Sequence, residues 1–370
     1  MPKVSVIMAC YNHSHYLGDS IGSVIGQSHQ DWELIFVDDG STDDSFSQAE
    51  KIASGNPAVK LIRQENRGQA KARQAGLDVA DGEFIVLLDS DDYLEPEMMA
   101  RCVERFASNL EIDVVAGDAI ITSEDVAVQK GILEQRRTPG WPGLLRQNCF
   151  GAPGALMLRR EKVIDAGGIE ADVGNGAEDW DLWTRLARIG GTFSVLRQPI
   201  ARYRLSESNH SLNFGRALEP IIQLLDFSRG RDSRLPSNQQ PAVTKRQYAK
   251  YRNGQVLRAF YADWWLGKKE SELSIILTQL EGPYIHMGYC QDMLVDVAYR
   301  LAHEDDSTIS RLSEKERDAL LVKAFAEKGL SHHAKAAVNL VWRVHTKGLR
   351  HHSWSGRLFN KWMSLAQRFG

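Results

Sequence analysis

Short apolar runs alternate with amphipathic segments over the amino-terminal part of the chain, and this alternation constrains the fold more than any other feature. The runs are rich in β-branched residues, which is typical of strands buried on both faces of a sheet. Strands are expected at residues 4–9, 32–37, 59–62, 84–88 and 113–116, and helices at 16–27, 43–54, 69–79 and 96–108. This order predicts an α/β fold with a mostly parallel central sheet flanked by helices.

The pattern changes beyond residue 117. A glycine-rich loop precedes a predicted helix, and a last strand near residue 201 runs into a polar loop. The apolar residues of that helix fall on one face: Leu182, Trp183, Leu186 and Ile189. The aperiodic segment SRGRDSRLPSNQQPAV predicts a linker. We therefore expect a first domain at residues 1–228, a linker at 229–245, and a helical domain at 246–370 that ends in a basic amphipathic helix.

Composition excludes several classes of protein. At 43% hydrophobic and 25% charged residues, the chain resembles an average soluble protein, and a net charge of -3 predicts no nucleic acid partner. Its four cysteines form no CxxC pair, so neither a zinc site nor a disulfide framework is expected. We find no signal peptide and no apolar run of about 20 residues that could span a bilayer. We expect a cytoplasmic protein whose basic tail either contacts the membrane surface or docks on the first domain.

Three of the predicted strands end in unusual residues, and a parallel sheet binds ligands outside the carboxyl ends of its strands. The first is followed by ACYN, without the glycines of a dinucleotide fingerprint, so NAD is not expected. The second is followed by Asp38 and Asp39. These acids either shape a turn or accept hydrogen bonds from a nucleobase or ribose, with Tyr11 bordering the base.

The apolar run at residues 84–88 leads into Asp89, Asp91 and Asp92. A solvated acidic turn is one reading, but three like charges within four residues raise one another's pKa unless a cation neutralises them. Mg²⁺ or Mn²⁺ together with a diphosphate would do so. Haloacid-dehalogenase-type phosphatases also place DxD after an apolar strand. They carry it at their first strand, however, with Thr or Val where Tyr93 stands here.

Three segments together resemble an inverting family 2 glycosyltransferase with the GT-A fold, over about residues 3–210. They are VSVIMACYNHSHYLGDSIGSVIGQSHQDWELIFVDDGSTDDS, ENRGQAKARQAGLDVADGEFIVLLDSDDYLEP and GAEDWDLWTRLARIGG. The resemblance implies that residues 1–228 are the catalytic domain. It also implies a nucleoside diphosphate sugar donor, UDP-linked by preference, and a saccharide or lipid-linked acceptor in surface polysaccharide synthesis. The alternative is a nucleotide- or carbohydrate-binding protein of the same fold without turnover.

The same resemblance implies roles for individual residues. Nucleotide binding is implied for Ala9, Tyr11, Asp38, Asp39, Asp91, Arg67 and Lys71. The alternative for Arg67, Lys71 and Arg73 is a solvated helix surface. The metal would be held by Asp92, Asp91 and Asp89. Asp179 is the implied catalytic base, and Glu178 and Trp180 belong to the acceptor loop. Asp181, about 200° round the helix from Asp179, should point elsewhere. His210 comes late for a metal ligand, and we expect a loop residue there.

Overall fold

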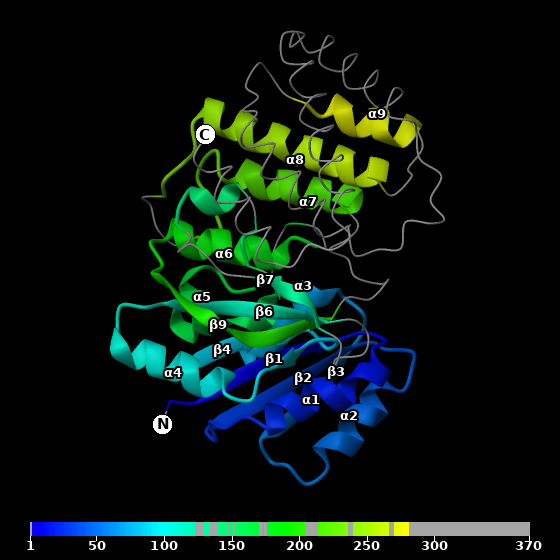
Figure 1. The fold of residues 1–370 in the computed structure, drawn as a ribbon, viewed down its shortest axis with the longest axis vertical. Helices are drawn as coiled ribbons and strands as arrows, with labels where there is room; N and C mark the ends of the chain where they lie inside the picture. The colour runs from blue at the N-terminus through cyan, green and yellow to red at the C-terminus, as the bar shows by residue number, and fades with distance from the viewer. Residues whose placement is uncertain are drawn as a thin grey trace. The chain divides into compact units, whose positions relative to one another are not determined.

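The computed structural model describes ten stretches of the chain: residues 2–122, 129–133, 140–146, 148–150, 152–169, 173, 176–204, 214–235, 240–265 and 270–280. The expected basic tail and His210 lie outside them. Contacts divide the chain into two units (Figure 1). The first comprises Met1–Ser208 with Asp232–Pro241, and the second comprises Asn209–Arg231 with Ala242–Gly370. Part of the expected linker, Asp232–Pro241, thus belongs with the first unit.

A mixed β-sheet forms the centre of the first unit. Within the described residues it has nine strands in the order β3-β2-β1-β4-β8-β6-β9-β5, with β7 beside β6. The strands are β1 Val4–Cys10, β2 Trp32–Asp39, β3 Val59–Gln64, β4 Phe84–Leu87, β5 Tyr93–Leu94, β6 Val114–Thr122, β7 Gln129–Leu133, β8 Leu156–Arg159 and β9 Phe193–Arg204. The helices are α1 Leu17–Ile25, α2 Ser45–Ala53, α3 Gln69–Asp78, α4 Met98–Ser108, α5 Arg160–Asp165 and α6 Glu178–Arg188.

The first four strands of the sheet are parallel, as the βαβα pattern predicts. In register, Val4 lies opposite both Trp32 and Phe84. Beyond β4 the pairing is mixed: β8 runs antiparallel to β4 and β6, whereas β9 runs parallel to β6. The described residues between β6 and β8 form β7 and short 3-10 turns rather than the crossover helix that a parallel return needs. The predicted α/β fold is confirmed; the sheet is mixed, with its uninterrupted parallel run from β3 to β4.

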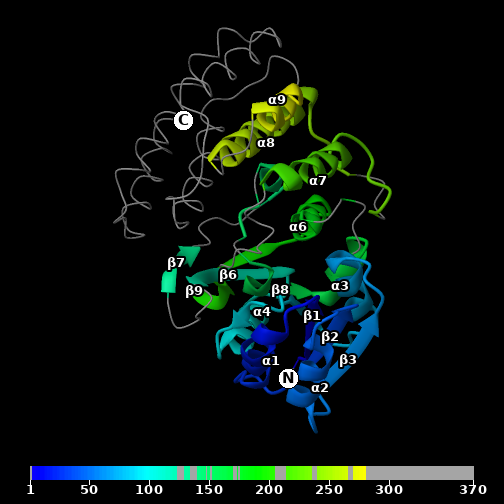
Figure 2. The same ribbon diagram turned by 90° about the vertical axis from the view of Figure 1, so that its right-hand side faces the viewer.

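Helices cover both faces of the sheet, because alternate strand residues point to opposite sides. Val6 and Met8 of β1 belong to a core cluster that includes residues of α1, α2 and α4. Ile7 and Ala9 belong to a second cluster with residues of α3, α5 and α6. Figure 2 shows α4 and α6 on opposite sides of β6. Burial on both faces accounts for the nearly continuous apolar runs in the sequence.

The described part of the second unit is helical. It contains α7 Phe214–Phe227, α8 Lys245–Trp265 and α9 Glu270–Thr278, with α8 in contact with the other two. Its buried residues include Leu225 of α7 and Phe260 of α8. In the described stretches, no helix combines the length and the apolar character needed to cross a membrane.

Candidate active site

The loops that follow β1, β2 and β4 meet at the carboxyl edge of the parallel strands and are joined by hydrogen bonds. Asn12 has a positive φ of 57°, and its Oδ1 accepts from the backbone N–H of Thr42 (2.8 Å) and of Asp43 (3.3 Å). His13 Nδ1 lies 2.8 Å from Ser90 Oγ in the acidic loop after β4. The three loops predicted to carry a ligand site therefore form one connected surface.

Asp38 and Asp39 are both buried at the end of β2 but have different partners. Asp39 accepts from the backbone N–H groups of Arg67 (2.9 Å) and Gly68 (2.8 Å), and from the Gln64 amide (2.7 Å). Asp38 pairs with Arg63 Nε at 3.1 Å. Three donors thus hold the Asp39 carboxylate where the chain enters α3.

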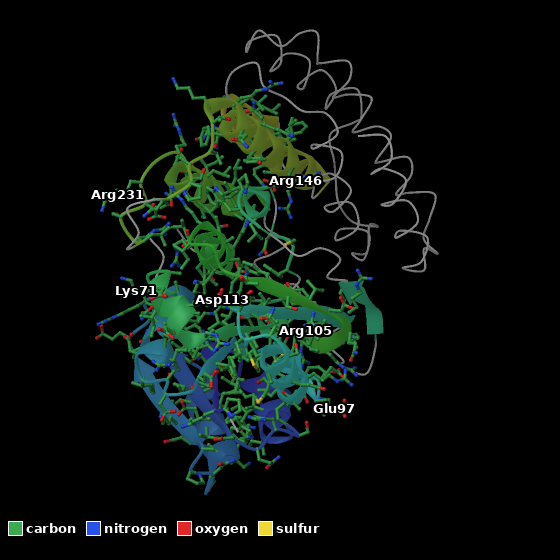
Figure 3. All side chains as sticks on the ribbon, turned by 90° about the vertical axis from the view of Figure 1, so that its left-hand side faces the viewer. Lys71, Glu97, Arg105, Asp113, Arg146 and Arg231 are labelled. Atoms are coloured by element: carbon green, nitrogen blue, oxygen red, sulfur yellow. The ribbon has the colours of Figure 1, made fainter. Side chains whose placement is uncertain are left out.

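The remaining residues predicted to bind the nucleotide lie at the same edge. Ala9 is buried at the end of β1, and Tyr11 just beyond it is 46% exposed. Arg67 and Lys71 are exposed around the start of α3, and Figure 3 shows Lys71 at the surface. An exposed aromatic ring and two cations beside a buried carboxylate are suited to a base and its phosphates.

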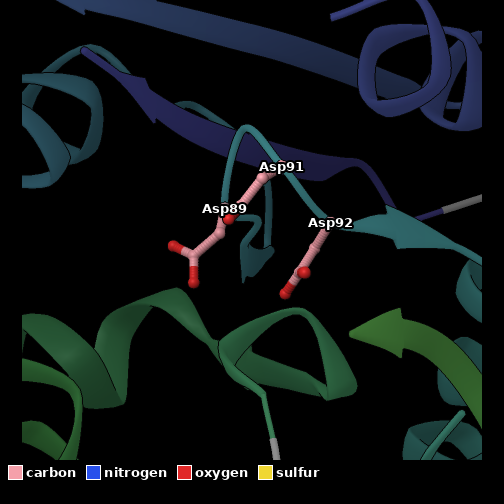
Figure 4. Close-up of side chains that lie close together, drawn as sticks. All are labelled: Asp89, Asp91 and Asp92. Carbon is pink, nitrogen blue, oxygen red and sulfur yellow. The ribbon is translucent and has the colours of Figure 1, made fainter. Parts of the chain in front are cut away.

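Asp89, Asp91 and Asp92 form a cluster after β4, and each offers an oxygen within 4.8 Å of the others. Figure 4 shows the carboxylates of Asp89 and Asp92 directed to the same side of the loop. Asp92 is buried, its Oδ1 accepts from the backbone N–H of Arg204 (2.9 Å), and its Oδ2 has no hydrogen-bond partner. Burial and the neighbouring acids raise the pKa of Asp92 well above its usual range, and that of Asp91 less. A buried unsatisfied carboxylate oxygen beside two other carboxylates fits a hard divalent cation.

Two arginines hold this acidic loop. Arg204, the last residue of β9, donates from Nε to the carbonyl of Asp91 (2.7 Å) and from Nη2 to Asp19 (2.8 Å). Arg73 of α3 is fully buried and donates from Nη2 to Asp89 Oδ1 and from Nη1 to Glu178 Oε1 (3.3 Å). The Arg73 guanidinium therefore links the acidic loop to the amino end of α6.

The two adjacent acids at the start of α6 differ in their partners. Glu178 is buried, and its second oxygen accepts from the Gly176 N–H (2.8 Å). Asp179 is half-buried and accepts from the Asn148 amide (3.2 Å) and the Trp180 N–H (2.6 Å). Burial, and then the charge of Glu178, raise the pKa of Asp179 to about 6, while Arg73 opposes the rise. A carboxylate with this pKa suits a general base near neutral pH, and Glu178 is held by Arg73 instead.

Two further residues of α6 are placed by the structure. Asp181 points away from Asp179, as the helical spacing predicts, and pairs with Arg185 (2.7 Å) and Arg234 (3.0 Å). Trp180 is buried and donates its indole N–H to the Leu144 carbonyl (2.7 Å). Its indole therefore anchors the 3-10 turn at Gly143–Leu145 rather than lying open to a ligand, and a role toward an acceptor stays a prediction.

Sequence reasoning missed several residues that support the site. Arg204 carried a usable signal, since it ends the last strand, opposite the acidic loop. Asn148 carried none, because it lies in a loop 31 residues before Asp179 and nothing in its surroundings indicates a partner. Gln69, which donates to Asp89 (2.8 Å), likewise gives no signal by spacing.

A sheet whose parallel strands end in such an acidic loop, with a pair of acids at the start of α6, is the arrangement expected of a GT-A glycosyltransferase. Residues 5–167 match the model of glycosyl transferase family 2. The chain is 30% identical over 222 residues to an uncharacterized glycosyltransferase of Nostoc sp., covering 57% of this chain and 67% of that protein. The protein therefore belongs to glycosyltransferase family 2, as the motifs indicate, and not to the phosphatases.

Further relatives agree with this family. The putative teichuronic acid biosynthesis glycosyltransferase TuaG of Bacillus subtilis is 30% identical over 215 residues, covering 57% of this chain and 82% of that protein. Among solved structures, S. aureus TarS 1-349 in complex with UDP-GlcNAc matches with a TM-score of 0.57 at 17% identity, over 95% of this chain and 93% of that one. The structural match supports the GT-A fold.

Proposed function

We propose that the protein transfers a sugar with inversion from a nucleoside diphosphate donor, UDP-linked by preference, to a saccharide or lipid-linked acceptor in surface polysaccharide synthesis. The UDP-GlcNAc complex of TarS supports the choice of donor, and the putative role of TuaG in teichuronic acid biosynthesis supports surface polysaccharide synthesis. We assign the nucleotide to the residues at the carboxyl edge of the parallel strands: Ala9, Tyr11, Asp38, Asp39, Arg67, Lys71 and Asp91.

Asp179 is the proposed general base. It takes the proton from the acceptor hydroxyl while that oxygen attacks the anomeric carbon from the face opposite the diphosphate. The new glycosidic bond forms as the bond to the diphosphate oxygen breaks, so the configuration inverts and the electron pair leaves with the diphosphate. Asp92, Asp91 and Asp89 would hold Mn²⁺ or Mg²⁺, which when bound stabilises negative charge on the leaving group.

The observation that carries this proposal is the buried Arg73 bridge between Asp89 and Glu178. Through one guanidinium it fixes the acidic loop, where the diphosphate is expected, relative to the residue next to the base. Attack from the face opposite the leaving group requires the acidic loop and the base to be held at a fixed separation. A misplacement of about 1 Å can cost on the order of 100-fold in rate. The bridge therefore favours an enzyme over a protein that only binds the nucleotide.

The test has a binding arm and a turnover arm. Thermal unfolding is measured with UDP-, GDP- and dTDP-sugars, each with and without Mn²⁺, because a ligand that binds the folded state raises its stability. Release of nucleoside diphosphate from the donor that binds is then followed for wild type, Asp179→Asn and a control, Asp165→Asn, which alters an exposed carboxylate at the end of α5. We expect turnover in wild type and control and its loss in Asp179→Asn.

Other outcomes discriminate between the alternatives. Donor binding without hydrolysis or transfer in the wild type would favour the non-catalytic binding protein. Unchanged turnover in Asp179→Asn would refute the assignment of the base. Absence of a thermal shift with every donor would count against a nucleotide-sugar substrate altogether.

A further inference from the structure

The segment Asp232–Pro241 follows α7 in the chain but belongs by its contacts to the first unit. Its described residues, 232–235 and 240–241, include bonding partners of α6, the helix that carries Asp179. At the carboxyl end of that helix, Arg188 donates from Nε to the Pro241 carbonyl (3.0 Å). Nearer its amino end, Arg234 reaches Asp181. A stretch that the sequence presents as linker is therefore attached along the base helix.

Arg234 binds Asp181 through both of its terminal nitrogens. Nη1 donates to Oδ2 and Nη2 to Oδ1, each at 3.0 Å, which is the bidentate geometry of strong arginine–carboxylate pairs. The side chains are 11% and 2% exposed, so water screens the pair little. Arg185 donates to the same carboxylate, and its Nη1 also bonds the Gly168 carbonyl (2.8 Å).

The Arg234 guanidinium is also fixed from its own segment. Asp232 accepts from its Nε (2.9 Å) and Nη2 (2.8 Å). Gln240 closes the segment on itself by accepting from the Asp232 N–H (2.7 Å) and donating to the carbonyls of Asp232 (2.9 Å) and Leu235 (3.1 Å). Arg234 is thus presented to α6 by a short loop with its own internal bonds.

The spacing along α6 gives this contact its consequence. Each helical residue turns about 100°, so Glu178 and Asp181 lie within about 60° of each other, whereas Asp179 faces away from Asp181. Arg73 holds Glu178 and Arg234 holds Asp181. Two arginines on one side of the helix, one turn apart, fix its rotation and so the direction in which Asp179 points.

We propose that Arg234 is a positioning residue for Asp179 that acts through Asp181, and that the catalytic unit accordingly includes the separate segment Asp232–Pro241. This inference rests on the proposed role of Asp179. It concerns the orientation of the base and not the donor site, because Arg234 contacts α6 through Asp181, which lies about 200° round the helix from Asp179.

The test compares Arg234→Gln and the milder Arg234→Lys in the full chain. With the UDP-sugar that wild type turns over, we expect kcat to fall about 10–100-fold in Arg234→Gln and less in Arg234→Lys, while the donor KM stays within about twofold. The matched control is Arg159→Gln, which breaks another arginine–carboxylate pair of the first unit, Arg159–Glu83 at 2.9 Å, between β8 and the turn before β4. That variant should keep the wild-type kcat once its folded fraction is equal.

A double-mutant cycle separates positioning from a general loss of stability. If Arg234 acts through Asp181, the pair Asp181→Asn and Arg234→Gln should lower kcat no further than the worse single variant. Additive losses, a rise in KM with kcat unchanged, or an equal fall in Arg159→Gln would overturn the proposal.

Hydrogen exchange provides a readout that does not need turnover. The amides of residues 178–182 should exchange at least about tenfold faster in Arg234→Gln or Arg234→Lys than in wild type. In Arg159→Gln their exchange rates should be unchanged. An inactive wild type would refute the proposed function, and exchange would then still decide whether Arg234 orders this helix. Unchanged exchange in both Arg234 variants would refute the positioning role even in an active enzyme.

Discussion

Replacing Asp179 with asparagine should end transfer and, at neutral pH, stabilise the folded protein. Burial raises the pKa of Asp179 from its ordinary 3.8 to about 6. A carboxyl group whose pKa is higher in the folded than in the unfolded state opposes folding once it is ionised, here by about 3 kcal/mol. An asparagine carries no charge and is spared this cost. Its amide nitrogen would meet the Asn148 amide, so a hydrogen bond worth about 1 kcal/mol is lost. The expected net gain is about 2 kcal/mol.

The sign of this effect defines its pH dependence. Below about pH 3, Asp179 is protonated in both the folded and the unfolded state, so the variant should have no advantage and should show only the lost hydrogen bond. As the pH rises from 3.8 through about 6, wild type loses the stability that the variant keeps. Above pH 7 the difference should be at its maximum and constant.

Urea denaturation in EDTA between pH 4 and 8, followed by tryptophan fluorescence, measures this difference. Asp181→Asn is the control, two residues along the same helix. It leaves the buried Arg185 and Arg234 without their full counter-charge, so it should destabilise by about 3–5 kcal/mol. Since Asp181 and Asp179 share α6, the control also identifies the transition of the first unit. The raised pKa of Asp179 is refuted if Asp179→Asn is no more stable than wild type at pH 8, or if its pH 8 advantage persists in full at pH 4.

Three further changes test other parts of the site. Glu178→Gln removes a charge that raises the pKa of Asp179. The acid limb of the kcat–pH profile, expected near pH 6 in wild type, should therefore move to lower pH. A limb that stays in place would contradict the effect of Glu178 on Asp179. Asp92→Asn removes the buried oxygen without a hydrogen-bond partner. It should weaken Mn²⁺ binding, measured by electron paramagnetic resonance, by more than the roughly 10–100-fold typical of losing a hydrogen bond to a metal ligand. Gly40→Ala places a methyl group 2.7 Å from the Asn66 nitrogen at a φ of +75°, which should cost about 1–3 kcal/mol in urea denaturation and weaken UDP binding in calorimetry.

The predictable parts of the fold are the helices and strands that show apolar periodicity in the sequence. The strands of the parallel half follow from their buried runs, and the acids that end them follow from the rule for parallel sheets. The predicted bounds stop short where pairing continues through polar residues. β2, for example, extends to Asp39 because Asp39 pairs in register with Gln64, which no apolar pattern shows.

The supporting contacts of the site were not predictable, because they join residues that are remote in sequence. Arg73 and Glu178 are 105 positions apart, and Asp181 and Arg234 are 53 apart. A local pattern cannot distinguish a buried guanidinium from one on a solvated helix surface. The polar composition around Arg234, typical of a linker, also hides the bonds by which that segment attaches to α6.

The acids of the site divide by whether their charge is already compensated. Asp39 is held by backbone N–H groups, and Asp89 by Arg73. The buried Oδ2 of Asp92 has no hydrogen-bond partner, and the pKa of Asp179 is raised. A buried carboxylate without a compensating partner lowers stability. Such a residue is retained where a bound ligand or a transferred proton compensates its charge. Asp92 is one of the three residues proposed to hold the cation, and Asp179 is the proposed base. Asp39 and Asp89, also proposed to bind ligands, are instead held in place by partners within the protein.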